Sequence, residues 1–168
     1  VYVTLAACAG RTRHVSLGTG VTMPHTRHES ITASAFASLN EIAQGRVQLG
    51  ISTGDNGLRT IGQPKARIAD LETYVGQLRS LLAGRTVDFE AEAHGGITWL
   101  EEATGIPIHI AASGPKLSHA AARVGDGVIL CKPLTHAHMT EAISDAKRVA
   151  REGHAGANLR VMTWIQTS

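Results

Sequence analysis

The sequence contains little cysteine, few aromatic residues and almost no excess charge of either sign. Its 168 residues include two cysteines, Cys8 and Cys131, and aromatic side chains make up 4% of the chain. Two isolated cysteines with no CxxC pair do not form a disulfide framework, which favours a reducing, cytoplasmic location. Few aromatic side chains and a formal net charge of +2 argue against a surface that binds nucleic acid.

Long apolar runs are also missing. The longest, Leu5–Ala9 and Val128–Cys131, are far too short to cross a bilayer, so we expect no membrane partner. No metal site is expected, because His25, His136 and His138 do not form an HExxH motif and have no cysteine or carboxylate at ligand spacing. The sequence also has no GxSxG motif and no Walker loop.

What the sequence does contain is an alternation of strand-like and helix-like segments. Apolar runs predict five strands, at His14–Val21, Arg46–Ser52, Ile106–Ala112, Gly127–Cys131 and Arg160–Ile165. Helical spacing predicts helices that end at Gly10 and Gly84, the latter beginning at Pro64, and helices over Ile31–Ala43, Pro115–Val124 and Thr135–Glu152. The irregular stretch Arg85–Gly105 is expected to hold either a short hairpin or an excursion around Trp99.

This alternation predicts an α/β fold with a parallel sheet covered by helices. Two architectures fit: a doubly wound open sheet that binds a nucleotide, or part of a (β/α)₈ barrel, which normally needs roughly 200 residues or more. The chain begins at Val1 rather than at a methionine, in what reads as the middle of a helix. We therefore expect a single domain over residues 1–168 that is incomplete at both ends.

Glycines gather where three of the predicted strands end. They are Gly18 and Gly20, then Gly50, Gly54 and Gly57, then Gly114. Any one of these loops is explained by a tight turn, but three at the carboxyl edge of a parallel sheet indicate a ligand site.

Two further features fit both a site and a purely structural role. Ser113-Gly114-Pro115-Lys116 leads from a strand into a helix, where free N–H groups bind an anion unless Ser113 caps the helix. Arg27-His28 could act on a ligand, or could equally serve as a cap and an ion-pair partner.

The ordered set of motifs resembles the luciferase-like monooxygenase family. The matching segments are Leu17–Thr22, Thr26–His28, Gly45–Ile51, Thr53–Asp55, Ala111–Lys116 and Gly125–Leu130. Each is weak alone, but their order and spacing match over almost the whole chain. The resemblance implies about strands three to seven of a TIM (β/α)₈ barrel and a flavin-dependent oxidoreductase, which uses FMN with O₂ as a monooxygenase or the deazaflavin coenzyme F420 for hydride transfer.

The resemblance also implies which residues bind the cofactor. A non-prolyl cis peptide bond at Gly20-Val21 would lie behind the ring of the cofactor. The loop after the second strand would lie beside the edge of that ring, and the remaining segments would lie along the tail and phosphate of the cofactor. The expected cofactor-binding residues are Thr19, Gly20, Val21, Thr53, Gly54, Asp55, Ala111, Ala112, Ser113, Gly114, Cys131 and Lys132.

Departures from the family pattern leave the catalytic residue unassigned. Many members have proline where this chain has Glu29, and related deazaflavin enzymes often have glutamate where Asp55 stands. The resemblance further implies a small organic substrate and a homodimer when the protein is full length. A non-catalytic flavin-binding protein on the same barrel is the alternative to an enzyme.

Overall fold

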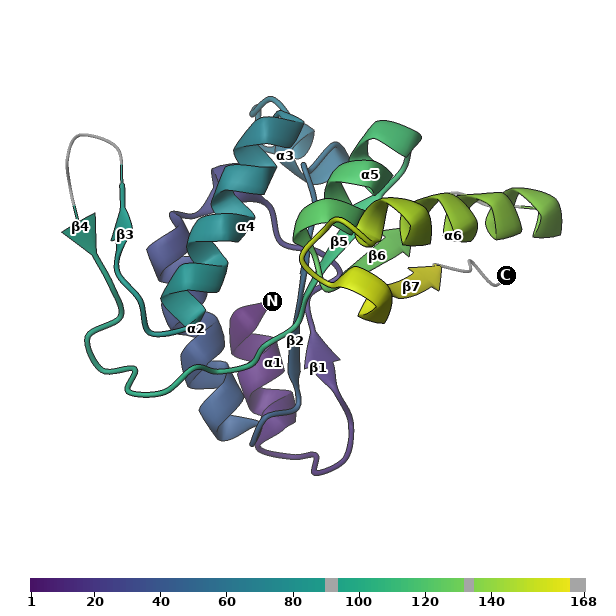
Figure 1. The fold of residues 1–168 in the computed structure, drawn as a ribbon. Coiled ribbons are helices and arrows are strands. Elements are labelled where there is room, and N and C mark those ends of the chain that lie inside the picture. The colour runs from purple at the N-terminus through teal and green to yellow at the C-terminus, as the bar shows by residue number, and fades with distance from the viewer. Residues whose placement is uncertain (90–93, 132–134, 164–168) are drawn as a thin grey trace.

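The computed structural model describes residues 1–89, 94–131 and 135–163, and at its centre lies a sheet of five parallel strands (Figure 1). The strands are β1 (Leu17–Gly18), β2 (Val47–Ile51), β5 (Ile108–Ala112), β6 (Gly127–Leu130) and β7 (Arg160–Thr163). They pair in that order, so none lies out of sequence. The expected parallel α/β fold is confirmed.

Helices connect the strands, and a short hairpin lies in the long connection between β2 and β5. The α-helices are α1 (Tyr2–Ala9), α2 (Glu29–Ile42), α3 (Asn56–Thr60), α4 (Ile68–Leu82), α5 (Pro115–Val124) and α6 (His136–Ala150). Short 3₁₀ turns are η1 (Pro24–Thr26) and η3 (Gly156–Asn158). β3 (Val87–Asp88) and β4 (His94–Gly95) pair antiparallel beside α4 (Figure 1).

Alternate residues of the strands enter one hydrophobic core with the helices. Its fully buried members include Leu49, Ile108 and Val128 from the strands and Phe36 and Leu78 from the helices. A strand order that never reverses carries its helices on one face, as in a barrel wall, whereas a doubly wound sheet reverses and carries them on both. The fold is therefore part of a (β/α)₈ barrel, and the doubly wound alternative is wrong.

Strand β1 is shorter than the sequence predicted. Only Leu17 and Gly18 pair with β2, instead of all of His14–Val21, and pairing resumes at an isolated bridge between Thr22 and Ile51. Between them the Thr19 side chain takes over the hydrogen bonds that a regular strand would make, because its hydroxyl bonds both backbone groups of Gly50. The chain bulges there, and the Gly20-Val21 peptide bond is cis, as the resemblance implied.

Two helix starts also differ from the prediction. Helix α4 begins at Ile68 rather than at Pro64, because the Asp70 carboxylate accepts the Arg67 backbone N–H at 3.2 Å and fixes the first turn. Helix α2 begins at Glu29, where the ring of His28 accepts the Ser30 N–H at 3.3 Å.

The remaining helix boundaries follow their sequence signals more closely. Helix α5 spans Pro115–Val124 as predicted, and Thr135 caps α6 as predicted. Helix α3 was not predicted, because the glycine-rich segment around it reads as a loop; Leu58, which is fully buried, anchors it. The last predicted strand is described as far as Thr163, and the rest of it lies outside the described residues.

Two kinds of feature are absent from the described residues. No helix there is both long enough and apolar enough to cross a membrane. Within the same residues, no group of three or more His, Cys, Asp or Glu side chains is arranged to hold a metal ion.

Candidate functional site

The carboxyl ends of four strands meet at one edge of the sheet, and this edge carries the predicted site residues. The Ser52 hydroxyl, just after β2, donates to the Ala111 carbonyl at 2.8 Å. The Cys131 N–H, just after β6, donates to the Ala112 carbonyl at 3.0 Å, and the Ser52 N–H donates to the Thr22 carbonyl at 3.1 Å. The structure therefore brings the ends of β1, β2, β5 and β6 together, while Lys132 lies outside the described residues.

The bulge after β1 is held against β2 by hydrogen bonds on one side and is accessible on the other. Thr19 is 7% exposed, and its hydroxyl donates to the Gly50 carbonyl at 2.7 Å and accepts the Gly50 N–H at 3.1 Å. A Cβ at Gly50 would lie 2.0 Å from the Thr19 carbonyl oxygen, so only glycine permits this approach. Apart from its two neighbours in the chain, no described residue has an atom within 4 Å of the Cβ that an alanine would add at Gly20, which leaves the outer side of the bulge accessible.

The loop after β2 packs against the loop after β1 through Met23. Gly54 has a φ of +76°, and a Cβ there would lie 2.5 Å from the Met23 sulfur. Thr53 accepts the Ala66 N–H at 2.9 Å, which closes the loop. Asp55 is exposed at the start of α3, and its side chain makes no capping hydrogen bond.

The loop after β5 leads into α5 beside a cavity of about 540 Å³. Gly114 is the N-cap of α5 and Pro115 its first residue, and no described side chain caps this helix. The capping role considered for Ser113 is therefore not observed, and the first N–H groups of α5 stay available to a ligand. No described atom lies within 4 Å of a Cβ added at Gly114, so the space above the helix start is open.

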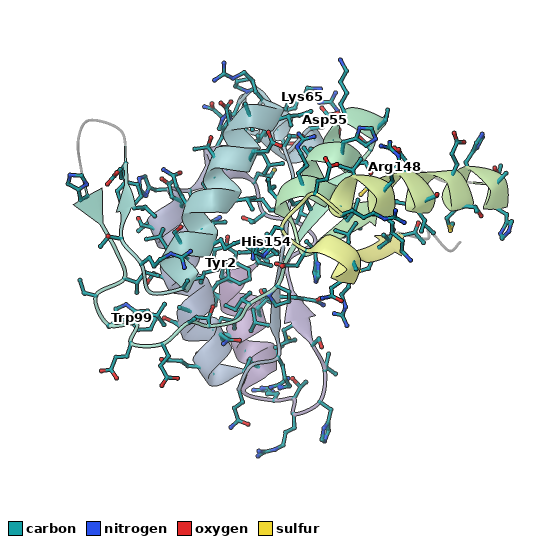
Figure 2. All side chains as sticks on the ribbon, in the orientation of Figure 1. Tyr2, Asp55, Lys65, Trp99, Arg148 and His154 are labelled. Carbon is teal, nitrogen blue, oxygen red and sulfur yellow. The ribbon has the colours of Figure 1, made fainter. Side chains whose placement is uncertain are left out.

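Helix α6 and the end of β6 form the rest of the cavity wall. The lining includes Ser118, Cys131, His138, Glu141, Asp145 and Arg148. Arg148 and His119 both pair with Asp145, and these hydrogen bonds lower the pKa of that carboxyl. Burial raises the pKa of the Cys131 thiol, which keeps it in the neutral form. Figure 2 shows Arg148 on α6.

Arg27 and His28 lie at a second cavity, of about 740 Å³, between η1, the start of α2 and α4. The Arg27 guanidinium stacks 4.8 Å from the centre of the Tyr2 ring, and the Arg27 carbonyl accepts the Tyr74 hydroxyl at 2.9 Å. Burial raises the pKa of Tyr74 to about 12. His28 caps α2 and lies 3.7 Å from Glu29, so the structural role considered for this pair is the one observed.

Sequence reasoning missed two parts of the site. The side chains of α6 that line the 540 Å³ cavity were not singled out, because helical spacing does not show which polar side chains of a helix line a cavity. His109, in the middle of the apolar run of β5, was also missed. It is 2% exposed, and neither ring nitrogen has a hydrogen-bond partner among the described residues.

Comparisons with known proteins agree with this geometry. A family model described as luciferase-like monooxygenase matches residues 1–168. The chain is 38% identical over 137 residues to a 5,10-methylenetetrahydromethanopterin reductase of Methanolobus tindarius. This match covers 77% of this chain and 41% of the relative. It is 37% identical over 136 residues to an F420-dependent glucose-6-phosphate dehydrogenase of Nocardia farcinica, with 74% of this chain and 40% of the relative covered.

A solved structure shows the same fold. The coenzyme F420 dependent tetrahydromethanopterin reductase from Methanopyrus kandleri superposes with a TM-score of 0.81 at 24% identity, over 97% of this chain and 53% of that one. The chain thus spans about half the length, or somewhat less, of the relatives that it matches. Family model, sequence relatives and fold agree, and the chain belongs to the luciferase-like monooxygenase family.

Proposed function

We propose that the protein is an oxidoreductase that binds a flavin-type cofactor at the carboxyl edge of the sheet, and that residues 1–168 supply about strands three to seven of its barrel. The observation that carries the proposal is the uncapped start of α5 at Gly114, open beside the 540 Å³ cavity. A helix N-terminus favours an anion, and both FMN and deazaflavin coenzymes carry phosphate.

The residues present fit such a cofactor. Ala111 has a side chain of one carbon, and Gly20 and Gly114 have none, so backbone can approach a flat ring and its tail closely. Ala112 lies on the opposite face of β5 and lines the 540 Å³ cavity. The cofactor, when bound, supplies the redox chemistry, by carrying a hydride or by activating O₂. The protein's part is to bind and orient it and to limit the access of water.

Each segment has a distinct task in this proposal. The N–H groups at the start of α5 bind the phosphate, together with Ser113 and Cys131 at the ends of β5 and β6. The bulge Thr19–Val21 supports the ring, and it is held in place by the two hydrogen bonds between Thr19 and Gly50. Thr53, Gly54 and Asp55 border the ring, because Met23 packs their loop against the bulge. No proton-transfer residue is assigned.

The relatives favour the deazaflavin branch over FMN with O₂. The Nocardia farcinica relative is named as F420-dependent, and it is 37% identical over 74% of this chain. We therefore propose hydride transfer between a deazaflavin and a small organic substrate, in a cytoplasmic enzyme. The family name keeps the monooxygenase with FMN as the second candidate.

Titration of the protein expressed from its complete reading frame tests the proposal. Quenching of fluorescence is followed as FMN or coenzyme F420 is added. We expect the protein to bind F420 and to catalyse hydride transfer with it, whereas preferential binding of FMN would favour the monooxygenase. Stoichiometric binding without turnover would instead identify a non-catalytic flavin-binding protein, and binding of neither would overturn the proposal.

A further inference from the structure

A buried histidine, His109, is the second residue of β5. His109 is 2% exposed, and both of its ring nitrogens lack a partner among the residues that the structure describes. Buried polar side chains are almost always hydrogen-bonded, because an unpaired polar atom loses its water and gains nothing in return. Some group beyond the described residues must therefore satisfy this ring.

The position of His109 in the sheet shows where that group has to be. Ile108 and Ile110, its neighbours on β5, enter the core shared with the helices. Because side chains alternate along a strand, His109 and Ala111 lie on the opposite face, which in a barrel is the interior. Ala111 is one of the residues assigned above to the cofactor, so His109 is the next residue down the same face.

Glycines flank His109 on both neighbouring strands. It pairs in register with Gly50 of β2 and with Gly127 of β6. A Cβ at Gly127 would lie 2.6 Å from the His109 Nδ1, so the imidazole lies over that glycine. On the other side, the Thr19 carbonyl occupies the space above Gly50. The ring thus lies in the same row as the bulge that supports the cofactor.

The environment keeps the imidazole neutral. Burial lowers the pKa of His109, the carboxylate of Asp126 opposes this shift in part, and the charge of Arg160 adds a smaller lowering. A neutral imidazole presents one donor and one acceptor nitrogen. It therefore suits a partner that is itself uncharged and offers both kinds of group, rather than a phosphate or a carboxylate.

We propose that His109 is a cofactor-binding residue, which hydrogen-bonds from inside the barrel to the imide edge of the flavin-type ring. That edge carries an N–H donor between two carbonyl acceptors in FMN and in deazaflavins alike, so either tautomer of the imidazole finds a partner there. The proposal rests on the proposed function, because it requires the ring to lie over Ala111 and the bulge.

Two variants of the complete protein test this role. His109→Phe keeps a ring of similar size and removes both nitrogens, whereas His109→Gln keeps a donor and an acceptor. We expect H109F to bind coenzyme F420 about tenfold more weakly, as for one lost hydrogen bond, and to shift the reduction potential of the bound cofactor. H109Q should recover part of the affinity and part of the wild-type reduction potential. The control His14→Phe, at an exposed histidine, should change neither the affinity nor the potential.

A measurement on the unchanged protein covers the case in which H109F does not fold. The ¹⁵N chemical shifts of the His109 ring are compared with and without F420. A change at one ring nitrogen on binding supports the proposal, and unchanged shifts overturn it. Equal affinity and equal potential in H109F and wild type would overturn it as well, while leaving the proposed function intact. If the wild type binds neither cofactor, the proposed function itself fails.

Discussion

The Thr19 hydroxyl donates a hydrogen bond to the carbonyl of Gly50 at 2.7 Å and accepts one from the N–H of the same residue at 3.1 Å. One side chain thus satisfies both backbone groups of a residue on the neighbouring strand. This lets β1 leave the ladder after Gly18 and bulge toward the candidate cofactor site without leaving Gly50 unpaired.

Replacing Thr19 with valine removes these bonds at nearly constant volume. We expect Thr19→Val to lower the free energy of unfolding by about 1–3 kcal/mol, because the Gly50 N–H loses its partner, while the Gly50 carbonyl keeps the N–H of Thr22 at 2.8 Å. Urea unfolding measures the change. Thr19→Ser, which keeps the hydroxyl, should lose much less, and equal losses in the two variants would contradict the role given to the hydroxyl.

A methyl group at Gly50 would clash with the backbone of Thr19. Its Cβ would lie 2.0 Å from the Thr19 carbonyl oxygen, which is backbone and cannot rotate away. We expect Gly50→Ala to destabilise the protein by at least about 2–3 kcal/mol, at the upper end for overpacking.

Gly76 provides the matched control. It is exposed on α4, and no described atom lies within 4 Å of an added Cβ. Gly76→Ala should stabilise the protein by about 0.5–1 kcal/mol through helix propensity. Thermal unfolding of both variants checks the pair, and a G50A protein as stable as wild type would show that the bulge does not lie where the structure has it.

The two cysteines should react differently with iodoacetamide. Cys8 is exposed, whereas Cys131 is half-buried in the 540 Å³ cavity and burial raises the pKa of its thiol. Cys8 should therefore be alkylated first, and the rate at Cys131 should rise only at a higher pH than is usual for a thiol.

Bound cofactor should slow the reaction of Cys131 further and leave Cys8 unchanged. Peptide mass spectrometry after timed labelling reports both sites in one sample, so Cys8 is an internal control. Equal slowing at both cysteines would point to a general change in stability, and no slowing at Cys131 would contradict its place beside the cofactor.

Acid should weaken the link between α5 and α6. Hydrogen bonds from His119 and Arg148 lower the pKa of Asp145 below its ordinary value of 3.8. Its contribution to stability is therefore fully present above that value and is lost as the pH falls through the lower pKa of the folded state. Because the carboxylate is partly exposed, we expect less than about 1 kcal/mol. The difference in unfolding free energy between wild type and Asp145→Asn should shrink as the pH falls below 4, and a difference that does not change over this acid range would contradict the ion pairs.

The fold was largely predictable because its signals are local. Pro115 at the first turn and Gly125 after the last residue set both ends of α5, and Thr135 set the start of α6. The start of α4 was not predictable from Pro64, since an interaction between Arg67 and Asp70 decides it. The early end of β1 depends on a contact with Gly50, 31 residues away, which no local pattern reveals.

The candidate site was predictable in outline and not in depth. Parallel strands end at one edge, so glycines and small residues there indicated the mouth of the site. Its walls depend on tertiary packing: Arg148 and Asp145 reach it from the far end of the chain. His109 sits in an apolar run that predicts burial, but the pattern does not show that its ring nitrogens are left without partners.

The most direct test of the central claim fills the open space at the start of α5. A valine at Gly114 would place its side chain where we assign the cofactor phosphate, at a position where no described atom of the protein lies within 4 Å of the added Cβ. Fluorescence titration with coenzyme F420 is carried out on wild type, Gly114→Val and the control Gly76→Ala. We expect at least tenfold weaker binding in G114V and wild-type binding in G76A, with both variants folded. Wild-type affinity in G114V would contradict a cofactor site at this edge of the sheet.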